Sequence, residues 1–301
     1  MHFRHHILRL YSGIPVTGIG GNQLSCAMSP ESAPQNSTPG PIARFATPCR
    51  VWAVGAIRGE VEKLQALHDQ LEPALRAGDK LVYLGNIIGR GERVRETVDE
   101  VLRFRRVFLS IPGNCIGDYA ILRGRQEEML HKLLELQFAV NPRDVLRWMV
   151  DQGAGPTIVA YGGTARDGEV AAAQGAVAVT RWTQSLRAGL NAAPGHREFL
   201  SSLKHAAYSA DGALVFVHAG LDPARPLDAQ GDGLWWNTTG FETMTAPFFG
   251  TERVIRGLDP EHRGVVDTDF TLSIDGGCGF GGTLWAVAIT PGEAQVDSLS
   301  A

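Results

Sequence analysis

The sequence is poor in cysteine and has no long hydrophobic run. Its four cysteines are Cys26, Cys49, Cys115 and Cys278. They are too few and too scattered for a disulfide framework or a zinc site of the C-x-x-C type, so we expect reduced thiols in a cytoplasmic protein. No run approaches the roughly 18 apolar residues of a membrane span, which predicts a soluble chain without a membrane partner.

An excess of positive charge is also lacking. The chain of 301 residues carries 28 basic and 32 acidic side chains, a net charge of −4. This balance gives no global electrostatic argument for binding nucleic acid. The length is sufficient for a sizeable core in one or two domains, and the composition sets no oligomeric state.

Residues 1–46 differ in composition from the rest. The first ten residues are basic and carry His2, His5 and His6, and residues 18–40 are rich in Gly, Ser, Pro, Asn and Gln. No apolar run of the length required by a secretory signal is present. We expect a disordered N-terminal extension over 1–46, in preference to a metal-binding tail, with Met28 as a second candidate start. The folded domain is expected at 47–295.

Three short apolar runs are each followed by a glycine-containing turn. The runs are Val51–Val54, Leu81–Leu84 and Val107–Ile111, and the turns lie at 55–59, 85–91 and 112–115. Helical spacing of apolar residues over 60–76 and 92–105 separates them. This pattern predicts strand–turn–helix units, with a ligand site outside the carboxyl ends of the strands.

The second half of the chain predicts further strands after a helical insertion. Residues 126–138 and 143–149 have helical periodicity, which indicates a helical cap at about 120–210. Apolar runs at 214–217 and 253–256 lead into His218 and Gly257, and residues 270–274 and 283–289 resemble a closing hairpin. These segments together predict an α/β fold in which two sheets pack face to face with helices outside.

Several side chains with chemical potential follow these strands: Arg58, Asn86, Arg90, Asn114, Cys115 and His218. Two arginines beside glycine turns suit an oxyanion, because guanidinium groups bind phosphate with paired hydrogen bonds. The alternative is that both arginines are solvated or paired with acids on the same loops.

Taken in order, these segments resemble the calcineurin-like metallophosphoesterase superfamily, closest to its branch of bacterial serine/threonine phosphatases and diadenosine tetraphosphatases. That family reads Gly-Asp-x-His-Gly, Gly-Asp-x-x-Asp-Arg-Gly, Gly-Asn-His-Glu, His-(Ala/Gly)-Gly-Leu and Gly-His-Thr-Pro. The similar segments here are Gly55-Ala-Ile-Arg-Gly59, Gly85-Asn-Ile-Ile-Gly-Arg-Gly91, Gly113-Asn-Cys-Ile116, Val217-His-Ala-Gly-Leu221 and Gly257-Leu-Asp-Pro260. The resemblance implies a four-layer fold with two packed sheets flanked by helices.

The resemblance also implies which positions would hold the family's two divalent metals. They fall on Ala56, Arg58, Asn86, Asn114, His218 and Leu258. Only Asn114 and His218 match the pattern, and Asn86 retains an oxygen without the carboxylate charge. The general acid of the family falls on Cys115, and its phosphate-binding arginine is retained as Arg90.

This set of residues does not favour catalysis. A two-metal site needs several anionic or imidazole ligands to hold the dications and lower the pKa of a bound water. We therefore expect no metal, with Asn86, Asn114 and His218 as vestigial ligands and Asn86 and Cys115 as vestigial catalytic positions. The expected protein is a pseudophosphatase in which Arg58, Arg90, Asn114 and His218 bind a phosphate-containing small molecule or a phosphoprotein.

Three alternatives remain open at this stage. Arg58 can fill the metal position and pair with Asp259 or Asp275 instead of binding an anion. The protein can be an active phosphoesterase, hydrolysing a phosphoric monoester or a dinucleoside polyphosphate with one weakly bound divalent metal such as manganese. Cys115 as a covalent nucleophile is the least favoured, since no Cys-x5-Arg loop follows it.

Overall fold

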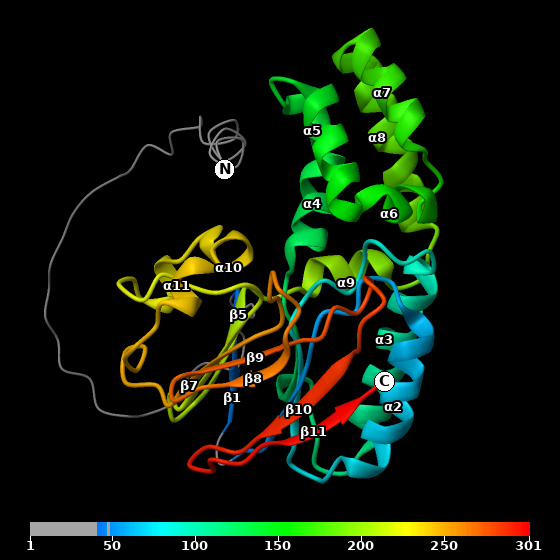
Figure 1. Ribbon diagram of the computed structural model, residues 1–301. Helices are drawn as coiled ribbons and strands as arrows, with labels where there is room; N and C mark the ends of the chain where they lie inside the picture. Colours follow the sequence, from blue (N-terminus) through cyan, green and yellow to red (C-terminus); the bar gives the residue numbers. More distant parts are fainter. Residues whose placement is uncertain (1–40, 47–48) are drawn as a thin grey trace, which may run out of the picture.

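The computed structural model describes residues 41–46 and 49–301 (Figure 1). The predictions for residues 1–40, including His2, His5, His6 and Met28, lie outside the described residues. The folded part begins before the predicted boundary at residue 47. Strand β1 (Ile42–Phe45) pairs in parallel with β5 (Ala206–Ser209), and Phe45 is fully buried. The apolar Ile42 and Phe45 therefore belong to the fold and not to an extension.

Two mixed sheets form the centre of the protein, which confirms the predicted α/β fold with two packed sheets. The five-stranded sheet has the order β11-β10-β2-β3-β4 and the six-stranded sheet the order β1-β5-β6-β7-β9-β8. The strands of the first sheet are β2 (Val51–Val54), β3 (Lys80–Tyr83), β4 (Tyr119–Ile121), β10 (Trp285–Ile289) and β11 (Asp297–Ser300). Those of the second, besides β1 and β5, are β6 (Leu214–Val217), β7 (Arg253–Arg256), β8 (Gly264–Asp267) and β9 (Thr271–Asp275).

Strands β2 and β6 are apolar at every position because both faces of their sheets are covered there. In β2, Val51 and Ala53 face the core between the sheets, whereas Trp52 and Val54 face the helices. In β6, Leu214 and Phe216 likewise belong to the core between the sheets. This alternation follows the two-residue period of a strand. A run of four apolar residues is therefore the signal of a strand buried on both faces.

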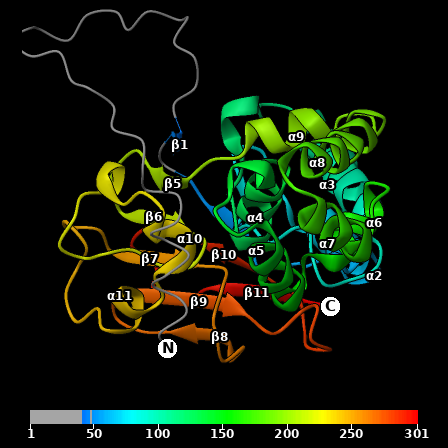
Figure 2. The same ribbon diagram turned by 90° about the horizontal axis from the view of Figure 1, so that it is seen from above.

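Helices cover the outer faces of both sheets (Figure 2). The five-stranded sheet is covered by α2 (Val61–Ala74) and α3 (Val94–Ser110), and the six-stranded sheet by α10 (Gly233–Trp236) and α11 (Thr239–Glu242). A helical cap rises above the sheets; it contains α4 (Arg125–Leu134), α5 (Pro142–Met149), the π turn η3 (Val150–Ala154), α6 (Gly155–Ala160), α7 (Ala165–Gln174), α8 (Ala176–Asn191) and α9 (His196–Ser202). Three 3₁₀ turns lie at Ile116–Asp118, Leu136–Phe138 and Leu227–Ala229.

Two of the predicted elements are wrong. Residues 107–111 are not a strand, because α3 continues to Ser110 with Phe104 and Phe108 buried in its apolar stripe. The segments at 270–274 and 283–289 do not form a hairpin, because β9 pairs with β7 and β8 whereas β10 pairs with β2 and β11. Isolated bridges from Gly276 and Gly277 to Thr283 connect the two segments. The glycine-rich turn between them thus carries the chain from one sheet to the other.

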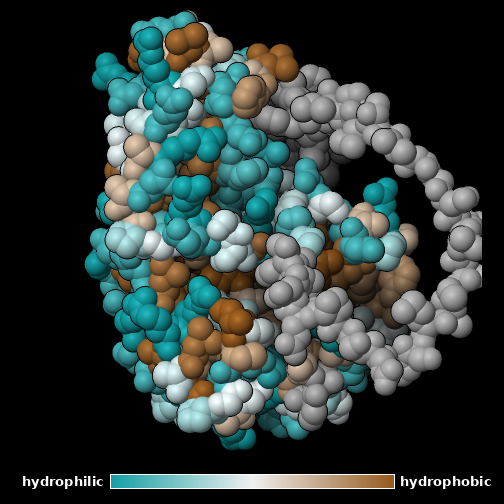
Figure 3. Space-filling view, turned by 180° about the vertical axis from the view of Figure 1, so that it is seen from behind, coloured by the Kyte–Doolittle hydropathy of each residue, from teal (hydrophilic) through white to brown (hydrophobic). Residues whose placement is uncertain are grey.

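The visible surface is mostly hydrophilic. On the face shown in Figure 3, the hydrophobic atoms of the described residues form scattered patches among hydrophilic ones. None of the helices within the described ranges has the length and apolar composition that a membrane crossing requires.

Candidate functional site

The carboxyl ends of the parallel strands from both sheets meet at one edge. Strands β2, β3 and β4 run parallel in one sheet, and β6, β7 and β9 run parallel in the other. The two sets are joined where His218 Nδ1 lies 2.7 Å from the Leu84 carbonyl oxygen. Within the six-stranded sheet, the Gly257 amide donates to the His218 carbonyl oxygen. The turns after these strands therefore build one site.

The turns after β2 and β3 are held together by their backbones. The amides of Ile57 and Arg58 both donate to the Asn86 carbonyl oxygen, at 3.0 and 2.7 Å. A Cβ at Gly59 would lie 2.7 Å from the Gly89 carbonyl oxygen, so only glycine allows this approach. Arg58, Asn86 and Arg90 have φ angles of 55°, 54° and 44°. Such left-handed conformations cost about 1 kcal/mol or more in a residue with a side chain, and they concentrate at functional sites.

Asn114 and Cys115 do not join this site. They lie in the loop between α3 and β4, where Asn114 Oδ1 accepts a hydrogen bond from the Gly78 amide, before β3 begins. The other predicted residues on this sheet follow the opposite, carboxyl end of β3. Because α3 continues to Ser110, the segment at 113–116 follows a helix and does not occupy the turn after the third strand.

The turn after β4 instead reads Gly124-Arg125-Gln126-Glu127. By its place in the sheet, this segment takes the position of the Gly-Asn-His-Glu motif of the resemblance. The signal was present in the sequence, because a short apolar run, Ala120–Leu122, stands just before it. Gly124 and Glu127 match that motif, whereas Arg125 and Gln126 stand where it has asparagine and histidine.

Glu127 organises the turns although it is fully enclosed. One carboxylate oxygen accepts from the amides of Asn86 and Gly124, at 2.9 and 2.8 Å, and the other accepts from Ile87 and Ile88, at 2.7 and 3.1 Å. Burial raises the pKa of Glu127 despite these four hydrogen bonds. The Asn86 side-chain oxygen accepts from the Gln126 amide at 3.0 Å. The amide oxygen of Asn86 is therefore already used in positioning the turn.

Arg58 forms a buried ion pair with Asp275, one of the two acids considered from the sequence. The two guanidinium nitrogens lie 2.6 and 3.0 Å from the two Asp275 oxygens, and Nη1 also donates to the Cys278 carbonyl oxygen at 2.8 Å. The Arg58 and Asp275 side chains are 3% and 0% exposed. Burial acts to raise the pKa of Asp275, but the hydrogen bonds and charge of Arg58 outweigh it and hold that pKa below its usual range.

His218 is a buried neutral imidazole with one nitrogen unused. Its Nδ1 donates to the Leu84 carbonyl oxygen, so Nε2 carries a lone pair. Nε2 has no hydrogen-bond partner among the described residues. Burial, opposed only in part by the Leu84 hydrogen bond, lowers the pKa of His218 to about 3.

The turn after β7 is occupied by ion pairs and an apolar residue. Leu258 is buried, and Asp259 pairs with Arg256 at 3.1 Å and with Arg263 at 2.7 Å. Asp259 is thus paired with other arginines and not with Arg58. The carboxylate charges nearest this turn are already balanced.

Arg90 differs from Arg58 because its guanidinium has no acidic partner among the described residues. Its guanidinium carbon lies 3.9 Å from the centre of the Phe280 ring, which Arg58 approaches at 5.2 Å. The Arg90 backbone amide donates to the Gly153 carbonyl oxygen in the cap at 2.9 Å. Burial, and then the charge of Arg58, lowers the pKa of Arg90. A bound anion would offset both causes, because its negative charge stabilises the charged form of Arg90.

The residues at this edge do not fit the two-metal centre that the fold family implies. The described residues contain no group of three or more His, Cys, Asp or Glu side chains placed to hold a metal ion. The Asp259 and Asp275 carboxylates are paired with arginines, and the Asn86 oxygen is engaged. The remaining donors are the imidazoles of His218 and of His262, which contacts Asp275 at 3.1 Å. Arg58 adds a permanent cation. This donor set cannot balance the charge of two dications.

Comparisons with known proteins found similar solved structures but no similar sequence. No protein-family model and no curated protein sequence matches the chain. A solved structure named as a candidate diadenosine tetraphosphatase matches with a TM-score of 0.51 and 19% identity over 86% of this chain and 97% of its own. Weaker matches include a serine/threonine phosphatase from Saccharomyces cerevisiae with similarity to human phosphatase PP5, with a TM-score of 0.48 and 10% identity over 86% of this chain and 83% of its own. A metallophosphoesterase from Sphaerobacter thermophilus matches with a TM-score of 0.43 and 15% identity over 84% and 88%.

The first of these likenesses carries the fold assignment. It covers 86% of this chain and 97% of the other chain. The chain therefore has the calcineurin-like metallophosphoesterase fold.

Proposed function

We propose that this protein binds a phosphate-containing ligand, a small molecule or a phosphoprotein, without hydrolysing it. The observation that carries the proposal is the unpaired Arg90 guanidinium at the edge where the strand ends meet. The ring of Phe280 covers one face of this guanidinium, which leaves its edge N–H groups as donors. Such a cation, half-buried and without an acid, suits a phosphate oxygen.

The neighbouring Arg58 has a different role in this proposal. Its charge is neutralised by Asp275, and its donors are used by that carboxylate and by the Cys278 carbonyl oxygen. Arg58 therefore replaces the cation that a metal supplies in the fold family, and Arg90 contributes the free charge. Asn114, which was predicted as a fourth ligand, is not part of the proposed site. The His218 imidazole at the same edge adds no positive charge.

The absence of hydrolysis is proposed from the chemistry of the side chains. Hydrolysis requires a group that deprotonates or polarises the attacking water and an acid that protonates the leaving oxygen. Arg125 and Gln126 stand at the positions of the family's asparagine and histidine, and neither titrates near neutral pH. Cys115 lies at the other end of the sheet, so it cannot supply a nucleophile.

The proposal is tested by thermal shift with inorganic phosphate on three proteins: wild type, Arg90→Gln and the control Arg95→Gln, which changes an exposed arginine on α3. Ligand at 100 times its Kd stabilises a protein by about 2.7 kcal/mol, which is a shift of several degrees. We expect this shift in wild type and Arg95→Gln and its loss in Arg90→Gln. Equal shifts in all three would remove Arg90 from the site.

The second candidate function is a phosphoesterase with a single metal such as manganese. The unused Nε2 lone pair of His218 favours it, because a neutral imidazole is a common metal ligand. Elemental analysis and turnover of p-nitrophenyl phosphate with manganese decide between the two. Stoichiometric metal, with turnover that disappears in His218→Ala, would establish the enzyme and refute the pseudophosphatase.

A cytoplasmic location also belongs to the proposal. Cys49, Cys115 and Cys278 have free thiols, and Cys49 and Cys278 are buried. Free thiols are typical of a reducing compartment.

A further inference from the structure

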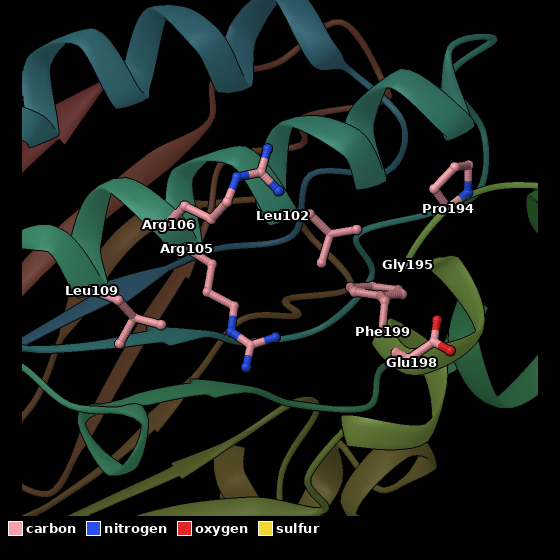
Figure 4. A pocket seen from close by; sticks show the side chains of 8 residues that line it. All are labelled: Leu102, Arg105, Arg106, Leu109, Pro194, Gly195, Glu198 and Phe199. Carbon is pink, nitrogen blue, oxygen red and sulfur yellow. The ribbon is translucent and has the colours of Figure 1, made fainter.

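A cavity lies between α3 and α9 and shares no residue with the turns of the candidate site (Figure 4). Its volume is about 410 Å³, within the range of small-molecule sites. Its apolar wall is formed by Leu102 and Leu109 from α3 and by Pro194 and Phe199 from the α9 side. This wall suits an aliphatic or aromatic body.

Charged side chains line the same cavity without pairing with one another. Arg105 and Arg106 come from α3 and Glu198 from α9, and no ion pair of these three occurs among the described residues. In the view of Figure 4, the Arg105 guanidinium and the Glu198 carboxylate lie on either side of Phe199. Two cations and one anion leave a net charge of +1 around the cavity.

The Arg105 side chain has a buried donor without a partner in the part of the chain that the structure describes. Its Nε is buried and has no hydrogen-bond partner among the described residues, while its guanidinium lies over the Tyr119 ring at 5.7 Å. A buried donor without an acceptor costs about 1–3 kcal/mol. The Nη nitrogens of the same guanidinium have no hydrogen-bond partner among the described residues and are not enclosed like Nε, so they are the donors open to an oxygen acceptor in the cavity.

We propose that the cavity binds a small monocarboxylate with an apolar body. The carboxylate accepts hydrogen bonds from Arg105, whose planar donor geometry matches two oxygens. The apolar body packs on Leu102, Leu109 and Phe199. Glu198 opposes a second carboxylate at the far end, so a dicarboxylate of the same length binds more weakly.

The experiment is calorimetric titration of the full chain with hexanoate, hexan-1-ol and adipate. Hexanoate is expected to saturate one site, hexan-1-ol to bind at least tenfold more weakly, and adipate to bind more weakly than hexanoate. Arg105→Gln is expected to weaken hexanoate binding tenfold or more, as for loss of a charge-assisted hydrogen bond. The control Arg181→Gln, an exposed arginine on α8, leaves it unchanged.

Glu198→Gln provides a second test that does not depend on the folding of Arg105→Gln. The exposed Glu198 can be changed without loss of the core, and the variant is expected to raise the affinity for adipate relative to hexanoate. The proposal is overturned if hexanoate does not saturate, if hexan-1-ol binds equally well, or if the adipate ratio is unchanged in Glu198→Gln. Arg90→Gln retains hexanoate binding, so this outcome is separate from that of the phosphate site.

Discussion

Replacing Arg58 with leucine gives the most informative perturbation of the candidate site. The change removes the guanidinium from the Asp275 carboxylate, which is 0% exposed, and leaves it the His262 Nδ1 at 3.1 Å and the amides of Gly277 and Asp259. Removing one partner of a buried ion pair costs about 3–5 kcal/mol, because the remaining charge is left uncompensated. We expect the free energy of unfolding at pH 7 to fall by about this amount.

The loss of stability in Arg58→Leu is expected to depend on pH. In the wild type, the pKa of Asp275 lies below its ordinary value of 3.8, so the stability from this carboxylate is present above that pH and is lost as the pH falls through the lowered pKa. In Arg58→Leu, the hydrogen bonds and charge of Arg58 no longer oppose burial, so we expect the pKa of Asp275 to rise from its wild-type value, with the Gly277 amide and His262 as the remaining opposing groups. The difference in stability between the two proteins is therefore expected to be largest near pH 7 and to shrink toward pH 4.

The assay is urea denaturation of wild type, Arg58→Leu, Asp275→Asn and the double variant at pH 7 and pH 4.5. A double-mutant cycle isolates the coupling between the two side chains. Arg95→Leu, on the exposed side of α3, is the control for loss of an arginine. A cost below about 1 kcal/mol for Arg58→Leu, with no dependence on pH, would refute the reasoning.

Three further predictions concern the same edge of the sheets. Glu127→Gln loses the carboxylate that accepts four backbone N–H groups, so the free energy of unfolding should fall by about 2–4 kcal/mol. A decrease in this free energy of less than about 0.5 kcal/mol would contradict the role of Glu127. The pKa of His218 is about 3 in the folded state and near 6.5 in the unfolded state. Between these pH values the unfolded state binds more protons, so the free energy of unfolding should fall as the pH decreases, by up to about 1.4 kcal/mol per pH unit. His218→Gln, followed by thermal denaturation from pH 7 to 4, should lack this component, and an unchanged slope would show that His218 does not titrate as proposed. Gly153→Ala places a Cβ 2.5 Å from Arg90 Cγ and should weaken phosphate binding several-fold, whereas Gly162→Ala, with a similar positive φ and nothing within 4 Å, should alter stability only.

Much of the architecture was predictable from short-range pattern. The runs at 51–54 and 214–217 are apolar at every position because both faces of their sheets are buried. The glycines after them mark turns that allow two backbones to approach. The helix over 60–76 was equally clear, because its apolar stripe has the helical period, and the structure confirms it as α2.

The third strand was misplaced because two signals competed. Residues 107–111 are apolar and partly β-branched, which favours a strand. The buried positions Val94, Val98, Val101, Phe104 and Phe108 nevertheless keep the three- and four-residue spacing of one helix. The helical period continued through the supposed strand, and the strand that follows, β4, has only three residues.

The pairing of the site residues required the tertiary structure. The sequence offered Asp259 and Asp275 as equal partners of Arg58, and only the packing of β9 beside β7 selects Asp275. The cap contact at Gly153 and the ring of Phe280 are separated from Arg90 by 63 and 190 residues in sequence, so no local pattern could join them.

The central claim is that this edge of the fold binds phosphate without a metal. It is tested most directly by calorimetric titration of inorganic phosphate into the wild type and Arg90→Gln, each with EDTA and with manganese. The account predicts that wild type binds phosphate equally in both conditions and that Arg90→Gln binds at least tenfold more weakly. Binding by the wild type that requires manganese and disappears in EDTA would contradict it.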